Sequence, residues 1–227
     1  MGFKSVLGVI PARGGSKGIP RKNLEMFCGA PLIEWTIREA RKTTGLDRLI
    51  LSSDDPEIIA VAERLGCEVP FVRPPNLATD TASSVDVMLH AVDQVRGYDV
   101  AVLLQPTSPL RLAEDIDGTL ARMTETGVPS CVSVCEAPCH PYLIFRPDAG
   151  GRLMPYAVPA AGPAGRRQDF EPALRLNGAV YAVDLTWFKR TGVFVAPGQT
   201  AAYVMPTSRS VDVDTFEDLR IARRFAA

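Results

Sequence analysis

The chain has 227 residues, with 25 Lys and Arg against 26 Asp and Glu, so its formal net charge is −1. This length fits one α/β domain and argues against two full domains. A nearly neutral chain has no general attraction to nucleic acid or to an anionic membrane, so an anion site has to be local. The amino terminus lacks a signal-peptide pattern and no apolar run is long enough to span a bilayer, which predicts a cytoplasmic protein.

Short apolar runs alternate with amphipathic stretches along the first part of the chain. The apolar runs predict strands at residues 6–12, 48–53, 68–72, 100–105 and 130–135. The amphipathic stretches predict helices at residues 31–44, 56–65, 84–95 and 113–126. This alternation predicts a Rossmann-like α/β fold, in which a mostly parallel sheet is flanked by helices. Further strands at 177–183 and 202–204, and a helix opened by a capping box at Thr215, complete one domain over residues 1–227.

The regular alternation stops at about residues 138–175, where proline and glycine are frequent. An irregular stretch of this length inside a domain is usually functional. We expect a lid, a dimerisation arm or part of a substrate pocket, and a merely mobile excursion is the alternative.

The five cysteines are odd in number and lack paired CxxC spacing, which is typical of reduced thiols. A zinc site built from Cys131, Cys135, Cys139 and His140 is the alternative. Because Cys131 and Cys135 would share one face of a strand, we favour buried apolar thiols. Structural roles are expected for His140 and for His90, which falls in a predicted helix.

The stretch after the first strand has the composition of an anion site. Residues 13–23 contain four cations and three glycines. Glycines let backbone N–H groups approach phosphate oxygens, and Arg13, Lys17, Arg21 and Lys22 can neutralise a triphosphate. Neither the P-loop pattern nor the dinucleotide pattern Gly-x-Gly-x-x-Gly occurs, which disfavours a P-loop ATPase and a dinucleotide oxidoreductase. An ordinary solvated basic loop is the alternative.

Two aspartates near the carboxyl terminus predict a metal site. Val211 to Asp214 alternate apolar and acidic residues, so on a strand both carboxylates would leave one face, roughly 6–7 Å apart along the chain. Like charges there repel unless cations share the site, and Mg²⁺ with nucleotide phosphates fits. The alternative is an exposed strand end at which Asp214 only caps the last helix.

Five motifs, in order along the chain, resemble those of the acylneuraminate cytidylyltransferases, also called CMP-sialic acid synthetases. They are IPARGGSKGIPRKN at residues 10–23, Arg73-Pro74 with LATDTASS at 77–84, LQPTSPLR at 104–111, NGAVY at 177–181 and DVDT at 212–215. The related Kdo enzymes typically carry Ser-Arg-Leu-Pro in the first motif, where this chain has Ser16-Lys17-Gly18-Ile19-Pro20. The resemblance therefore favours the nonulosonate branch, including the legionaminate and pseudaminate relatives, and implies the nucleotide-diphospho-sugar transferase type of fold.

The resemblance implies that CMP is transferred from CTP to the anomeric hydroxyl of a nine-carbon keto sugar acid, with pyrophosphate leaving. It implies Mg²⁺, or alternatively Mn²⁺, held by Asp212 and Asp214. Deprotonation of the hydroxyl is left to a metal-bound hydroxide or to Asp212. The residues implied to bind the nucleotide are Arg13, Gly14, Gly15, Ser16, Lys17, Lys22, Asn23, Arg73 and Ser84. Those implied to be catalytic are Arg13, Lys17, Lys22, Gln105 and Asp212.

The residues implied to bind the sugar are Gln105, Arg167, Arg175, Tyr181 and Phe194. Each has a plainer alternative: Gln105 as a partner of loop backbone, the two arginines as surface residues, and the two aromatic residues as core. Arg73 as a surface residue is a similar alternative.

The family resemblance also leaves the exact sugar and the assembly to be tested. After His140-Pro141 the chain has apolar residues where sialate-type members have a basic one, so sialate, legionaminate and pseudaminate stay open. A homodimer with a composite site is expected. The competing functions are nucleotidyl transfer to another keto sugar acid such as Kdo, and a non-catalytic nucleotide-binding module.

Overall fold

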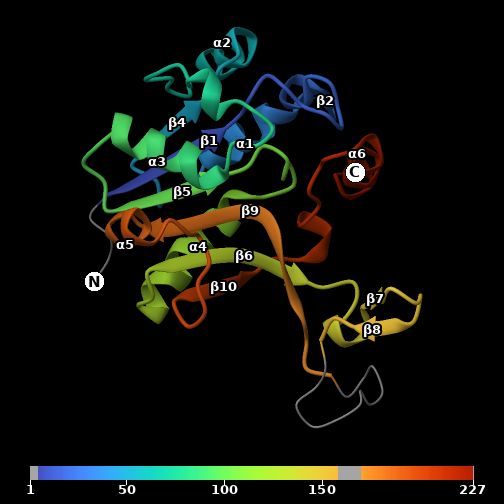
Figure 1. Cartoon of the computed structure of the whole chain (residues 1–227). Helices are drawn as coiled ribbons and strands as arrows, with labels where there is room; N and C mark the ends of the chain where they lie inside the picture. The colour runs from blue at the N-terminus through green and yellow to red at the C-terminus, as the bar shows by residue number, and fades with distance from the viewer. Residues whose placement is uncertain (1–4, 158–169, 227) are drawn as a thin grey trace.

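The computed structural model describes residues 5–157 and 170–226, and its centre is a six-stranded sheet with the order β10-β6-β9-β5-β1-β4 (Figure 1). The strands are β1 Val6–Pro11, β4 Arg48–Ser52, β5 Val100–Leu104, β6 Ser130–Glu136, β9 Leu174–Asp184 and β10 Thr200–Val204. β1 is parallel to β4 and β5, and β10 is parallel to β6, whereas β9 runs antiparallel between β5 and β6. The mostly parallel α/β sheet predicted from the sequence is confirmed.

Helices cover both faces of this sheet. They are α1 Leu32–Ala40, α2 Pro56–Arg64, α3 Ser84–Gln94, α4 Ala113–Thr126, α5 Leu185–Thr191 and α6 Phe216–Phe225. α1, α2 and α4 contribute to one hydrophobic cluster with the sheet, and α3 and α5 contribute to another. α6 packs in a third cluster with the short hairpin β2 Met26–Phe27 and β3 Ala30–Pro31. No helix among the described residues is long and apolar enough to cross a membrane.

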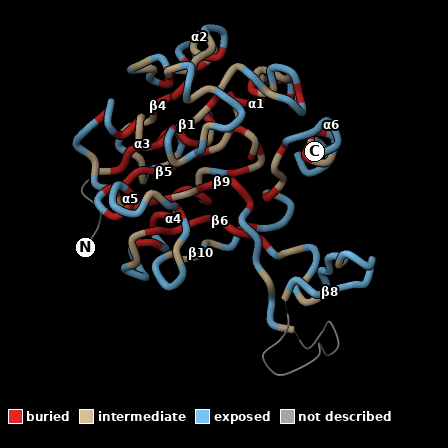
Figure 2. Tube along the Cα trace, viewed as in Figure 1, coloured by how far each residue is buried: buried red, intermediate tan, exposed pale blue. Residues whose placement is uncertain are grey.

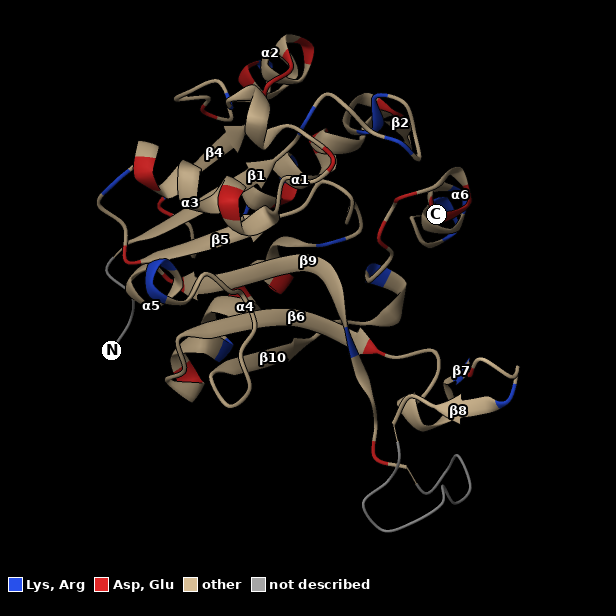
Figure 3. Cartoon of the chain, viewed as in Figure 1, with Lys and Arg blue, Asp and Glu red and all other residues tan. Residues whose placement is uncertain are grey.

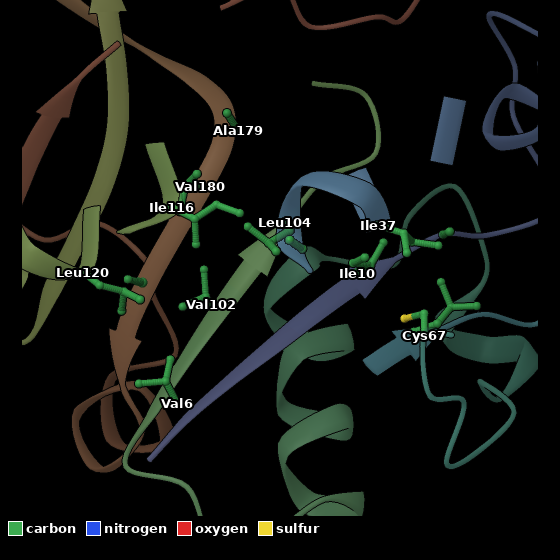
Figure 4. Close-up of a cluster of buried hydrophobic side chains, with 14 of the residues drawn as sticks. Val6, Ile10, Ile37, Cys67, Val102, Leu104, Ile116, Leu120, Ala179 and Val180 are labelled. Atoms are coloured by element: carbon green, nitrogen blue, oxygen red, sulfur yellow. The ribbon is translucent and has the colours of Figure 1, made fainter. Parts of the chain in front are cut away.

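The core lies on both sides of the central strands, which is why these strands are continuously apolar. In β1, Val6 and Ile10 join the cluster on the α1 face, and Leu7 and Val9 join the cluster on the α3 face. Figure 4 shows part of the first cluster, and Figure 2 shows the buried residues concentrated along the sheet. Full burial of one such side chain contributes about 1.5–3 kcal/mol, so this core holds the strand ends in fixed places.

The irregular stretch contains a hairpin that stands away from the sheet (Figure 1). A short 3-10 helix, η3 Pro141–Leu143, leads into β7 Phe145–Pro147, which pairs antiparallel with β8 Leu153–Pro155. Asp148 forms the turn by accepting hydrogen bonds from the N–H groups of Gly150 and Arg152, at 2.8 and 2.9 Å. The chain is next described from residue 170 and then enters β9.

Two predicted strands are wrong. Residues 68–72 contribute one isolated bridge, between Ile50 and Glu68, because Pro70 has no N–H with which to continue the ladder. Residues 211–214 are not a strand either: the Val213 N–H donates to the Thr107 carbonyl at 2.8 Å and the Asp214 N–H donates to Oδ2 of Asp218 at 3.2 Å, and neither bond belongs to a strand ladder. The β2–β3 hairpin and α5 were not predicted, because both are too short to show a period in the sequence.

The cysteine prediction agrees with the fold. Cys131 and Cys135 are both fully buried in β6, and both are free thiols. Burial raises the pKa of Cys131 to about 12, so this thiol stays protonated at neutral pH. Cys139 is exposed. His90 lies in α3, and His140 caps η3 by accepting a hydrogen bond from the Tyr142 N–H at its Nδ1.

Candidate active site

A cleft of about 340 Å³ opens beyond the carboxyl ends of β1 and β5, the edge at which open α/β sheets bind ligands. Four segments line it: the glycine-rich loop after β1, the segment from Arg73 to Val87, the turn after β5, and the segment containing Asp212 and Asp214. The predicted site residues among its lining are Arg13, Gly15, Ser16, Lys22, Asn23, Arg73, Ser84, Gln105, Asp212 and Asp214. Residues separated by up to about two hundred positions therefore share one cavity.

The glycine-rich loop depends on glycine where other segments approach it closely. A Cβ on Gly14 would lie 2.6 Å from Oδ2 of Asp55, and one on Gly18 would overlap the carbonyl oxygen of Asp214. The Gly14 N–H donates to Oδ1 of Asp54 at 3.1 Å. At the other end, the Asn23 amide donates to the carbonyl oxygen of Arg13 at 2.9 Å and folds the loop back on itself. The loop is therefore held in one shape at the mouth of the cleft.

Every cation of the loop faces a carboxylate from another segment. Figure 3 shows basic and acidic residues interspersed along the ribbon. Arg13 and Lys17 share Asp80, at 2.6 and 2.9 Å, and Arg21 pairs with Asp55 at 3.1 Å; Lys22 pairs with Asp214 at 2.7 Å. Because Lys22 is mostly buried and Asp214 is exposed, this last contact connects the wall of the cleft to its rim.

The two aspartates differ in environment. Burial raises the pKa of the Asp212 carboxyl, and the neighbouring Asp214 adds to this effect, while a hydrogen bond with Thr107 and the charge of Lys22 oppose it. The Oδ1 atom of Asp212 is buried and has no hydrogen-bond partner among the described residues. Although residues 211–214 are not a strand, Val213 is buried and both aspartates line the cleft, so the predicted alternation holds.

Comparison with known proteins gives the family. The family model described as cytidylyltransferase matches residues 7–148. This chain belongs to the cytidylyltransferase family. It is similar to the pseudaminic acid cytidylyltransferase of Campylobacter jejuni, with 32% identity over 96% of this chain and 94% of the relative. It is also similar to the CMP-N,N'-diacetyllegionaminic acid synthase of Legionella pneumophila, with 31% identity over 92% and 91% of the two chains.

The fold of this cytidylyltransferase is shared with solved structures. A CMP:2-keto-3-deoxy-manno-octonic acid synthetase solved in complex with CTP superposes with a TM-score of 0.73 over 98% of both chains. Its sequence is 18% identical, so the match shows the fold alone. That fold is the Rossmann-like type expected from the sequence.

One wall of the cytidylyltransferase cleft carries a buried arginine. Arg73 is 4% exposed, which excludes the surface alternative. Its guanidinium donates to the hydroxyl and the carbonyl oxygen of Ser52. Burial lowers the pKa of Arg73 to about 10, so the side chain stays charged at neutral pH. With Asn23 and Ser84 on the same lining, the wall presents fixed hydrogen-bonding groups, as recognition of a base requires.

The residues implied to bind the sugar are only partly brought together. Gln105 lines the cleft, whereas Arg175, Tyr181 and Phe194 lie outside its lining. Of the residues implied to bind the nucleotide, Gly14 and Lys17 also lie outside the lining. Phe194 is buried and packs on Phe188 and Tyr181. Tyr181 is half-buried, and its pKa is raised by burial and by the charge of Asp212. Arg175 donates to the carbonyl oxygen of Ser210 at 3.2 Å, and Arg167 lies outside the described residues.

Sequence reasoning missed an internal polar network beside the site. Asn177 is 1% exposed; its Oδ1 accepts from the Ser133 hydroxyl at 2.6 Å, and its Nδ2 donates to the Ser210 hydroxyl at 2.9 Å. It lies where the β6–β9 register shifts, between Val132 and Val134. Asn177 thus joins the sheet to the segment that leads into Asp212. The sequence marks Asn177 as the first residue of the NGAVY motif and as part of an Asn-Gly turn signal, but neither pattern reveals its partners Ser133 and Ser210.

Several further lining residues had no assigned role, among them Asp80, Pro106 and Thr107. Thr107 has a visible function, since its carbonyl oxygen accepts from the Val213 N–H at 2.8 Å and so fixes the segment between the two aspartates. No local pattern in the sequence could reveal this bond, because the two residues are joined only by the fold.

Proposed function

We propose that this chain transfers CMP from CTP to the anomeric hydroxyl of a nonulosonic keto sugar acid and releases pyrophosphate. The observation that carries the proposal is the meeting of the cationic glycine loop with Asp212 and Asp214 in one cleft, with Lys22 Nζ 2.7 Å from Asp214 Oδ1. A nucleoside triphosphate and a divalent cation are the partners that such opposite charges fit together. The similarity to the pseudaminic acid and legionaminic acid enzymes supports the sugar class.

The triphosphate would lie along the glycine loop. Arg13, Ser16 and Lys22 line the cleft, and Lys17 stands at its rim. Transfer of a phosphoryl-type group depends mainly on positioning and on stabilising negative charge, which fixed cations and backbone N–H groups supply. Lys22 is held in place by its surroundings, since only 14% of its side chain is exposed.

The two aspartates fit Mg²⁺. The buried Oδ1 of Asp212, which has no hydrogen-bond partner in the described part of the chain, is costly unless a cation or donor meets it. Two carboxylates with substrate phosphates are a usual set of Mg²⁺ ligands. We therefore propose Asp212 and Asp214 as its protein ligands, with Mn²⁺ as a substitute. A bound Mg²⁺ would neutralise phosphate charge and orient the triphosphate.

The remaining groups orient the reaction. Asn23, Arg73 and Ser84 would bind the cytidine, and Gln105 would face the sugar. The hydroxyl oxygen forms a bond to the α-phosphorus while the bond from that phosphorus to the leaving oxygen breaks. Asp212 is the protein group proposed to accept the hydroxyl proton, because it is a largely desolvated carboxylate on the cleft lining.

We also propose a homodimer that works in the cytoplasm, where CTP is available. Exposed apolar residues on the hairpin support the dimer: Phe145 is 46% exposed, Leu153 70% and Met154 43%. Apolar side chains gathered on one projecting segment are typical of an interaction surface.

The test is a substrate panel. Purified protein with Mg²⁺ is given CTP, ATP or GTP together with N-acetylneuraminic, legionaminic, pseudaminic or 2-keto-3-deoxy-octonic acid, and pyrophosphate release is measured. We expect release with CTP and a nine-carbon acid. Asp212→Ala should lower kcat by about 10²- to 10³-fold, whereas Asp93→Ala, which removes an exposed carboxylate paired with Lys189, should not. Release with ATP or GTP but not CTP would refute the proposal.

A further inference from the structure

Asp55, Asp80 and Asp214, three of the carboxylates that contact the glycine loop, have different roles. Asp55 caps α2, where its Oδ1 accepts from the N–H groups of Glu57 and Ile58 at 2.9 and 3.1 Å. Its ion pair with Arg21 therefore has a structural role, since it connects the glycine loop to the start of α2. Asp214 is a proposed metal ligand. Asp80 has neither role: the contacts described for its side chain are the ion pairs with Arg13 and Lys17.

Asp80 is placed where a phosphate group would be expected. It lies in the turn between the 3-10 helix η2 Pro75–Leu77 and α3, and it lines the cleft together with Arg13. Its two oxygens reach one cation each, at 2.6 Å to Arg13 Nη1 and 2.9 Å to Lys17 Nζ. Hydrogen bonds from Lys17 and Arg13 lower the pKa of this carboxyl, so it is ionised at neutral pH. A carboxylate with one oxygen on each of two cations imitates two oxygens of a phosphate.

We propose that Asp80 is a built-in competitor of the triphosphate, which occupies Arg13 and Lys17 until a nucleotide displaces it and so limits nucleotide affinity. The inference rests on the proposed function in one respect, that these two cations bind phosphate. Displacement is feasible because the contact is open to water: 37% of the Asp80 side chain and 81% of the Lys17 side chain are exposed. Exposed ion pairs of this kind are weak and exchange partners readily.

The sign of the effect follows from the charges. When CTP binds, both ion pairs of Asp80 break and the carboxylate stays close to the incoming negative charge. Without the Asp80 charge, Arg13 and Lys17 bind the phosphates without first losing an ion pair, and no carboxylate at position 80 repels the phosphates. A neutral side chain at position 80 therefore tightens binding of polyanions, although the wild-type contacts look like attractive interactions.

The experiment compares binding to the full chain by titration calorimetry in the absence of divalent cations. The ligands are CTP and inorganic tripolyphosphate, each at low and at high salt. Asp80→Asn should bind both ligands about three- to tenfold more tightly than the wild type at low salt, and the difference should shrink at high salt because the charges are exposed. Asp80→Glu keeps the charge and should stay close to the wild type.

Asp93→Asn is the matched control, because it neutralises one exposed aspartate paired with Lys189 outside the cleft and should bind like the wild type. Equal or weaker binding of both ligands by Asp80→Asn would overturn the inference. If the wild type binds tripolyphosphate but not CTP, and Asp80→Asn binds tripolyphosphate more tightly, the competitor role stands and the cytidylyl assignment fails. Melting temperatures of all variants establish that each is folded.

Discussion

Gly178 brings the backbone of β9 into contact with the reactive end of the cleft. Its φ is +79°, and a Cβ there would lie 3.0 Å from Oε1 of Gln105 and 3.4 Å from Oδ2 of Asp212. An alanine at this position would therefore be strained by the left-handed backbone conformation. Its Cβ would also make a close contact with Gln105 and Asp212, to which we assign catalytic roles. Gly192, at the end of α5, has a similar φ of +65°, but a Cβ there would meet no atom of the described residues within 4 Å.

This pair of glycines separates backbone strain from displacement of the site. Both Gly178→Ala and Gly192→Ala should lose about 1 kcal/mol or more of stability from the strained backbone, measured by chemical denaturation. Only Gly178→Ala should also lower kcat, by roughly tenfold or more, because Gln105 and Asp212 have to move. Equal kcat values for the two variants would contradict this role for Gly178.

The residues that could be predicted from the sequence are those whose type and neighbours already specify a chemistry. Lys22 in a glycine-rich loop and Asp212 beside Asp214 carry their own signal, and the cleft contains all three. Asp80 and Gly178 do not, because one exposed aspartate in a polar turn and one glycine after an asparagine each fit many roles. Their significance comes from Arg13 and Gln105, which only the fold brings near them.

At the scale of elements, the sequence predicts helices and strands that are long enough to show a hydrophobic period. It does not predict segments whose conformation depends on one hydrogen bond or on one missing donor. The strands β1, β4, β5 and β6 and the helices α1 to α4 occur close to the expected ranges, because each is long enough to show its period. Residues 68–72 look like a strand until Pro70 is considered as a missing donor. Residues 211–214 keep the alternation of a strand but have no ladder beside them in the described part of the chain, which leaves the aspartates free to face the cleft.

The start of α6 depends on a capping box, which gives a test at this scale. Thr215 Oγ1 accepts from the Asp218 N–H at 3.2 Å, and Asp218 Oδ2 accepts from the Thr215 N–H at 2.8 Å. Thr215→Ala should cost about 1 kcal/mol, or roughly 2–4 °C in melting temperature for a chain of this size. Thr215→Ser keeps the cap and should retain most of the stability. A melting temperature of Thr215→Ala equal to that of Thr215→Ser would show that the box contributes nothing.

At the scale of the whole molecule, the fold brings an early and a late segment of the sequence together at the carboxyl ends of β1 and β5. Lys22 and Asp214, which meet at 2.7 Å, are 192 positions apart. The parallel strands deliver the loops after β1 and β5 to the same edge, and the antiparallel β9 returns along β5 so that Gly178 reaches Gln105. The projecting hairpin β7–β8 is not one of the segments that line the cleft, and it exposes apolar side chains to water.

The hairpin supplies the last prediction, which concerns assembly. In a dimer built on this surface each residue counts twice, so replacing Leu153 by a charged residue removes two apolar contacts and buries two charges. Leu153→Glu should therefore weaken the dimer by roughly a hundredfold or more, measured by sedimentation over a dilution series. Val72→Glu is the matched control, since Val72 is 66% exposed against 70% for Leu153 and lies outside the hairpin. A wild-type monomer at high concentration, or a Leu153→Glu dimer as tight as the control, would rule out this surface.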